Sequence, residues 1–190
     1  MIKKITLLLI GLTMILSACQ TQTVEPTPTE DEALATETPS VDPEAFELYL
    51  VADPQIAGPD LPFYDLEDLP LAEEPLISAD DFIRYLWDFH SLEVKEELYL
   101  QLVALFAESV PMSGVPFVIL SHGERIYAGA FWSPASSLHF DGVVILQPLD
   151  PAGGPLYITL GYPDNSWFTG EDPRSDPRLK EALEEAGVLE

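Results

Sequence analysis

The chain has 190 residues, of which 33 are acidic and only 8 are basic, and its formal net charge is −25. This charge excludes nucleic-acid binding, because affinity for DNA or RNA comes from clustered Lys and Arg side chains that neutralise phosphates. The charge suits a soluble surface or a cationic partner. A single cysteine excludes an internal disulfide, so the core must hold the fold together.

The first residues have the pattern of a cleaved export signal. Lys3 and Lys4 are followed by an apolar run over residues 5–16. A run of 12 residues is too short to cross a hydrocarbon core, which takes about 20. We therefore predict that residues 1–18 are a signal peptide.

The apolar run ends in Leu16-Ser17-Ala18-Cys19. This order of residues resembles the lipobox of bacterial lipoproteins. The resemblance implies that the thiol of Cys19 receives a diacylglyceryl group, that the chain is cut before Cys19, and that the new amino terminus is acylated. Acyl chains such as palmitate would then hold the protein in the cell membrane or outer membrane, with its folded part outside the cytoplasm. The alternative is an ordinary secretory signal followed by a free thiol.

Residues 19–45 are rich in Thr, Pro and Glu and almost free of apolar side chains, so we predict a disordered, lipid-anchored tether. Loss of Lys3 and Lys4 with the signal leaves six basic against 33 acidic residues, a net charge of −27. Such a chain is repelled by anionic headgroups, so we expect the domain over residues 46–190 to stand away from the membrane.

The domain begins with a β-prone segment over residues 46–51. Five prolines then exclude regular helix up to residue 77, while recurring leucines predict an extended, Pro-rich strap laid across the domain. Ser78 and Asp81 resemble a capping box, and the apolar spacing after them predicts a helix over 79–89.

The remaining elements alternate between strands and helices. After a short strand at 91–94, an apolar stripe predicts a helix over 95–107. Residues 115–120 and 125–131 are predicted strands joined by a hairpin turn at 121–124. Two more strands are predicted over 143–147 and 156–160, and a last helix capped by Asp176 and ended by Gly187. Together these predict a single α+β domain with a mostly antiparallel sheet of four to five strands covered by two or three helices.

No metal or cofactor site is predicted from the sequence. The three histidines, His90, His122 and His139, lack the spacing of a zinc site. The acidic loop beginning at Asp164 does not match the ligand positions of an EF-hand, and a looser calcium site stays open as an alternative.

The segment 133–141 is the candidate for catalysis. It holds Ser136, Ser137, His139 and Asp141, the residue types of a serine hydrolase, but lacks a G-x-S-x-G elbow. An aromatic ligand groove is the other candidate, with Trp132 before this segment and Tyr162 and Trp167 in a later loop. The competing interpretation is that these rings cover the core where the loops cross it.

Two further stretches, Gly129 to Pro134 and Gly170 to Arg174, resemble stretches of uncharacterised bacterial lipoproteins, a resemblance that implies no activity. The leading hypothesis is a membrane-anchored extracytoplasmic lipoprotein with a non-enzymatic binding domain. Its partner would be an envelope protein, a cell-wall component or a small molecule, and a cationic partner fits the charge. The alternative is a tethered hydrolase with its site around residues 133–141.

Overall fold

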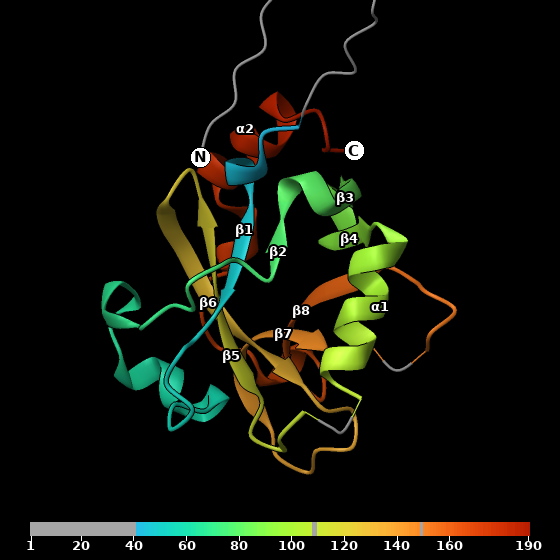
Figure 1. Cartoon of the computed structure of the whole chain (residues 1–190). Coiled ribbons are helices and arrows are strands. Elements are labelled where there is room, and N and C mark those ends of the chain that lie inside the picture. The colour runs from blue at the N-terminus through green and yellow to red at the C-terminus, as the bar shows by residue number, and fades with distance from the viewer. Residues whose placement is uncertain (1–40, 108–109, 149) are drawn as a thin grey trace, which may run out of the picture. The chain divides into compact units, whose positions relative to one another are not determined.

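The computed structural model describes residues 41–107, 110–148 and 150–190, in which one curled sheet of eight strands forms the frame of the domain (Figure 1). The predicted signal peptide, the lipobox and most of the predicted tether lie outside the described residues. The strands are β1 Glu47–Leu50, β2 Ile77–Ser78, β3 Phe82–Leu86, β4 Ser91–Val94, β5 Val115–Ser121, β6 Glu124–Trp132, β7 Phe140–Leu146 and β8 Leu156–Tyr162.

The strand order across the sheet is β2-β1-β5-β6-β7-β8-β4-β3. Every pair is antiparallel except β6 and β7, which run parallel. The hairpin between β5 and β6 turns at His122 and Gly123, whose φ values are 48° and 77°. Two successive residues with positive φ give a turn that matches the twist of the strands, and the predicted hairpin is confirmed.

The described part of the chain has two α-helices, α1 Glu96–Leu105 and α2 Pro177–Glu185, both close to their predicted positions. Asp176 caps α2, because its carboxylate accepts a hydrogen bond from the amide of Arg178 at 2.9 Å. Short 3-10 turns connect the other elements: η1 Pro43–Ala45, η2 Gly58–Phe63, η3 Leu66–Asp68, η4 Ala79–Asp81, η5 Trp87–Phe89, η6 Asn165–Trp167 and η7 Pro173–Ser175.

The predicted, mostly antiparallel sheet of four to five strands is wrong: the sheet has eight strands and is mixed through the parallel pair β6 and β7, although the domain remains α+β in the broad sense. The largest error is the predicted helix over 79–89. The capping box forms, with the amide of Ser78 donating to Asp81 at 2.9 Å, but only one 3-10 turn follows it. The chain then becomes β3, because pairing with β4 satisfies its backbone while Phe82 and Tyr85 enter the core.

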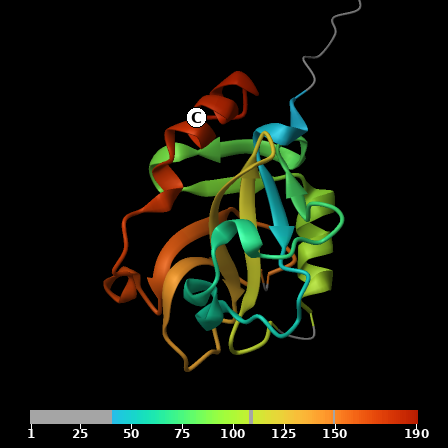
Figure 2. The same cartoon turned by 90° about the vertical axis from the view of Figure 1, so that its left-hand side faces the viewer.

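The main core lies on the inner face of the sheet, where the side chains of β5 to β8 pack against α1, α2 and the aromatic residues of β3. The outer face is covered in part by the Pro-rich strap, residues 52–76, as Figure 2 shows for β5 and β6. Ile56 and Leu69 of the strap pack on Val118 and Leu120 of β5. The Arg125 guanidinium fixes the strap further by donating to the carbonyls of Leu66 and Leu69 at 2.5 and 2.8 Å.

The folded domain includes residues 41–45, which the sequence assigned to the tether. Ala45 is fully buried, and its carbonyl accepts a hydrogen bond from the Ser121 hydroxyl at 3.1 Å. The carbonyl of Glu44 accepts another from the amide of His122 at 2.7 Å. The backbone of residues 44 and 45 therefore contacts the hairpin turn, and this stretch belongs to the folded domain.

Candidate functional site

The strap does not cover the whole outer face of the sheet, and part of β7 and β8 is exposed to solvent there. On this face Leu146 of β7 is 44% exposed and Tyr157 of β8 is 53% exposed, and the exposed Thr159 lies beside them. Phe89 of η5, which is 69% exposed, borders the same region. We call these four residues the uncovered face. Isolated exposed apolar residues are common, but a contiguous group beside a concave site marks a candidate binding surface.

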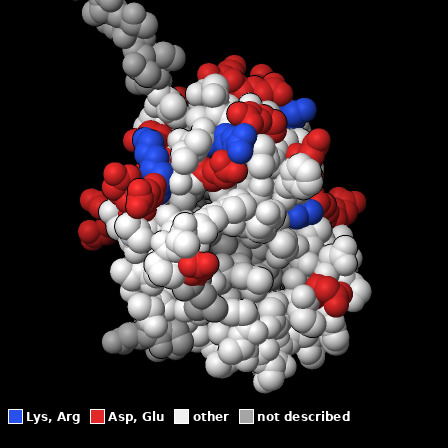
Figure 3. Space-filling view, turned by 90° about the vertical axis from the view of Figure 1, so that its right-hand side faces the viewer, with Lys and Arg blue, Asp and Glu red and all other residues white. Residues whose placement is uncertain are grey.

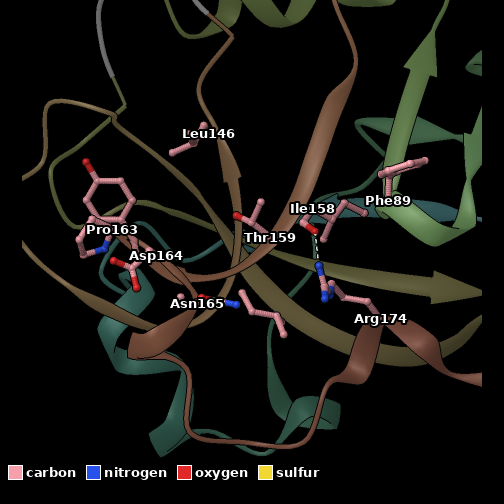
Figure 4. Close-up of a pocket in the computed structure, with 11 residues that line it drawn as sticks. Phe89, Leu146, Ile158, Thr159, Pro163, Asp164, Asn165 and Arg174 are labelled. Atoms are coloured by element: carbon pink, nitrogen blue, oxygen red, sulfur yellow. Dashed lines mark hydrogen bonds between the residues drawn. The ribbon is translucent and has the colours of Figure 1, made fainter.

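A groove of about 350 Å³ runs along the edge of β8 next to the uncovered face (Figure 4). Its floor is formed by residues 158–162 of β8, and its walls by Phe89, Leu146 and Arg174. The loop over residues 163–165 closes one end. We call this cavity the β8 groove.

The β8 groove exists because two backbone turns separate β8 from its neighbours. His90 lies between η5 and β4 and has a left-handed φ of 44°. The chain changes direction at this residue, so η5 does not extend the pairing of β4 with β8. At the other end Gly161 has a φ of 68°, and a Cβ there would lie 2.7 Å from the carbonyl oxygen of Asp164. Only glycine fits such a position, so this glycine shapes the end of the groove.

A polar cluster lies behind the groove. The Arg174 guanidinium donates from Nη1 to the carbonyl of Ile158 at 2.6 Å and from Nε and Nη2 to the Asp172 carboxylate at 2.9 and 2.7 Å. The same pair holds the pKa of Asp172 below its usual range. The Tyr85 hydroxyl lies 3.4 Å from Nδ1 of His90, and burial raises the pKa of this tyrosine. The cluster is therefore internally paired and holds the groove wall in place.

His90 makes the stability of this wall depend on pH. Burial, and then the positive charge of Arg174, lower the pKa of His90 below its usual value of about 6.5, against the opposing pull of Asp172 and Asp88. A histidine with a lowered pKa in the folded state takes up its proton more readily in the unfolded chain. We therefore expect the free energy of unfolding to decrease as the pH falls below about 6.5, over the interval down to the folded-state pKa.

The measurement is urea unfolding at several pH values for the wild type and for His90→Asn, because asparagine tolerates the left-handed backbone. The variant should show a weaker loss of stability as the pH falls below about 6.5. His122→Asn, at the other histidine with positive φ, is the matched control and leaves His90 intact. An unchanged slope in His90→Asn would contradict the assignment.

The candidate hydrolase residues do not converge. The Ser136 hydroxyl donates to the carbonyl of Met112 at 2.7 Å. The Asp141 carboxylate accepts from the amide and hydroxyl of Thr169 at 2.8 and 2.5 Å. Among the described residues no hydrogen bond joins Ser136 or Ser137 to His139, or His139 to Asp141. The segment 133–141 is therefore a loop held by hydrogen bonds to other segments.

The two predicted aromatic loops do meet, in two places. The Trp132 ring stacks on Phe140 at 4.9 Å with an interplanar angle of 5° and lies 5.9 Å from Tyr162. On the surface, the Trp167 ring stacks on His139 at 4.4 Å. Trp132 is fully buried, so its ring fills the outer core and has no face free for a ligand. Tyr162 lines the β8 groove, and its hydroxyl donates to the carbonyl of Pro134 at 2.9 Å.

Within the described residues, His, Cys, Asp and Glu side chains form no group of three that could hold a metal ion. The Asp164 carboxylate, the start of the acidic loop, accepts from the amide and hydroxyl of Ser166 at 2.9 and 2.5 Å and so caps η6. In this loop the carboxylates of Asp164 and Asp172 are therefore engaged in local turns.

Charge is distributed unevenly over the domain. Figure 3 shows Asp, Glu, Lys and Arg gathered over the upper part of one face, with few of them below. Charged residues are also unevenly distributed along the sequence. Within residues 98–163 the charged residues are Glu108, Glu124, Arg125, Asp141 and Asp150. Three of the four residues of the uncovered face, Leu146, Tyr157 and Thr159, thus belong to this weakly charged stretch of a strongly acidic protein.

Sequence reasoning missed Phe89 and Arg174 as groove residues. A signal for Arg174 was present in the duplicated Asp-Pro-Arg motif of residues 172–174 and 176–178. In each copy the aspartate accepts from the amide and guanidinium of the arginine two residues later. The motif therefore predicts a rigid turn that holds an arginine, although not where that arginine lies.

In the described part of the chain, no helix combines the length and the apolar character needed to cross a bilayer. Comparison with family models, with curated proteins and with solved structures found no match to this chain.

Proposed function

We propose that this protein is a lipid-anchored extracytoplasmic lipoprotein whose domain binds a partner in the cell envelope through the uncovered face and the β8 groove. The anchor part of the proposal is supported by Leu16-Ser17-Ala18-Cys19 at the end of a short apolar run. The binding part is carried by one observation: exposed Phe89 and Leu146 line a groove that has no strap residue in its lining, and exposed Tyr157 lies next to Leu146 and Thr159.

The contacts of the 133–141 segment favour binding over hydrolysis. A serine nucleophile needs a base within hydrogen-bond reach, and the base needs a group that orients it. Here the Ser136 hydroxyl and the Asp141 carboxylate are occupied by Met112 and Thr169, while the His139 ring packs on Trp167. Segment 133–141 would have to rearrange before it could act as a triad.

The binding surface is tested by site-directed photocross-linking in cells that produce the full chain. A photoreactive phenylalanine analogue at Tyr157 should give one defined adduct, and Leu146→Asp in the same chain should abolish it. Phe63, which is 83% exposed on η2 of the strap, is the matched control position and should give no such adduct. Equal adducts from both positions, or an adduct that survives Leu146→Asp, would refute this surface.

A further inference from the structure

We infer that the β8 groove binds an extended, positively charged peptide segment of the partner, which pairs with the free edge of β8 at Leu160. The inference rests on the proposed function and names the class of partner that the groove accepts. It combines the direction of the β8 backbone, the space beside it and the charges around that space.

The free edge follows from the hydrogen bonds of Ile158. Its amide donates to the carbonyl of His90 at 2.8 Å, and its carbonyl accepts from Arg174, so both groups point away from β7. Residues two apart in a strand present their backbone groups to the same edge. The amide and carbonyl of Leu160 therefore also point away from β7, although Leu160 lies opposite Val143 of that strand.

Space for another strand lies at this edge. β4 pairs with β8 only at Tyr157 and Leu156, because η5 and His90 turn the chain away. Beyond that point no described strand pairs with the edge, and the β8 groove of about 350 Å³ occupies the position. A neighbouring strand sits about 4.8 Å away, so an extended segment in the groove would continue the sheet where β4 leaves it.

The chain itself covers part of the edge of β3 and the end of β1. On β3 the amide of Tyr85 donates to the carbonyl of Val188 at 2.7 Å, and its carbonyl accepts from the amide of Glu190 at 2.8 Å. On β1 the amide of Ala72 donates to the carbonyl of Leu50 at 2.9 Å. Folded proteins shield strand edges in this way, and an uncovered edge is a template for another chain.

The charges around the groove select the partner segment. Asp164 lines the groove, and the exposed Asp88 precedes Phe89 on its wall. The one cation of the lining, Arg174, is already paired with Asp172. Lys or Arg side chains on the incoming segment would therefore meet two carboxylates that no described Lys or Arg neutralises, and an apolar side chain between them would pack against Phe89 and Leu146.

The test titrates the full chain, held in a neutral detergent, with the acetylated and amidated peptide Lys-Val-Leu-Val-Lys. Two analogues carry N-methyl groups on alternate residues, one at positions 1, 3 and 5 and the other at 2 and 4. An added strand pairs through only one of these sets. We expect one analogue to bind within about twofold of the parent peptide and the other at least about tenfold more weakly. Added salt should weaken the parent peptide.

Protein variants locate the binding. Leu160→Pro removes the amide hydrogen at the proposed contact and should weaken the parent peptide about tenfold, whereas Leu160→Val keeps it and should bind like wild type. Phe89→Ser should also weaken binding, and Phe63→Ser on the strap is its matched control. If Leu160→Pro fails to fold, the N-methylated pair still decides the question, because it changes only the peptide.

The outcomes separate this inference from the proposed function. Three results would overturn the inference. Both N-methylated analogues could lose affinity alike, both could retain it alike, or the parent peptide could fail to bind. A defined cross-link at Tyr157 together with such a result would leave the proposed function standing without strand pairing. Failure of both experiments would reject the uncovered face as a binding surface.

Discussion

Replacement of Cys19 by alanine is expected to move the protein from the membrane fraction to the soluble fraction. Under the proposed function the acyl chains are attached to this thiol, and each buried methylene contributes about 0.8 kcal/mol to membrane attachment. Two or three long chains hold a protein in the bilayer for its lifetime, so their loss should release essentially all of it. The measurement is fractionation of the envelope together with incorporation of labelled palmitate, which Cys19→Ala should abolish.

Gln20→Ala is the matched control for this experiment. It changes the neighbouring residue and keeps the thiol, so both membrane association and labelling should remain. An acidic domain of this kind gains nothing from anionic headgroups, and lipid is the attachment that the sequence offers. A Cys19→Ala protein that stays with the membrane, or a wild-type chain that takes up no label, would remove the lipid anchor from the proposed function.

The largest effect on stability is expected from Trp132→Ala. Trp132 is fully buried on the outer side of β6, stacked on Phe140. A Cβ added at Gly58 of the strap would lie 2.8 Å from its ring, and one at Gly114 2.6 Å, so the ring also packs closely on both of these segments. Removing a buried Trp side chain costs about 3–5 kcal/mol. Urea unfolding followed by circular dichroism should show this loss.

Two variants control this prediction. Trp167→Ala removes a ring that is 42% exposed and should cost less than about 1 kcal/mol. Trp132→Phe should fall between the two, because the buried indole Nε1 has no hydrogen-bond partner in the described part of the chain and its removal leaves nothing unpaired. A smaller loss in Trp132→Ala than in Trp167→Ala would show that the outer core does not depend on this ring.

Elements with strong local signals were predicted from sequence and have the expected structure. The hairpin between β5 and β6 follows from two β-prone runs around His122 and Gly123, which adopt positive φ. The start of α2 follows from Asp176 and Pro177, where the carboxylate cap forms within two residues. In these places the hydrogen bonds that decide the structure join near neighbours in sequence.

Residues 82–86 show where local reasoning fails. Their apolar spacing fits one face of a helix, and the capping box before them is real. The strand prevails because β4 on one side and residues 188–190 on the other satisfy its backbone, and neither partner is visible from the local pattern. Nonlocal pairing of this kind also explains why the sheet has eight strands, whereas four or five were predicted.

The sequence by itself determined the acidic character of the protein, the hairpin and the two α-helices, and it carries the resemblance to a lipobox that the Cys19 variant tests. These depend on composition or on residues a few positions apart. Only the tertiary structure decided that Ser136, His139 and Asp141 stay apart, and that Phe89, Leu160 and Arg174 surround one groove. Those outcomes depend on strand order and on where each strand loses its neighbour, because backbone hydrogen bonds between distant segments set which side chains meet.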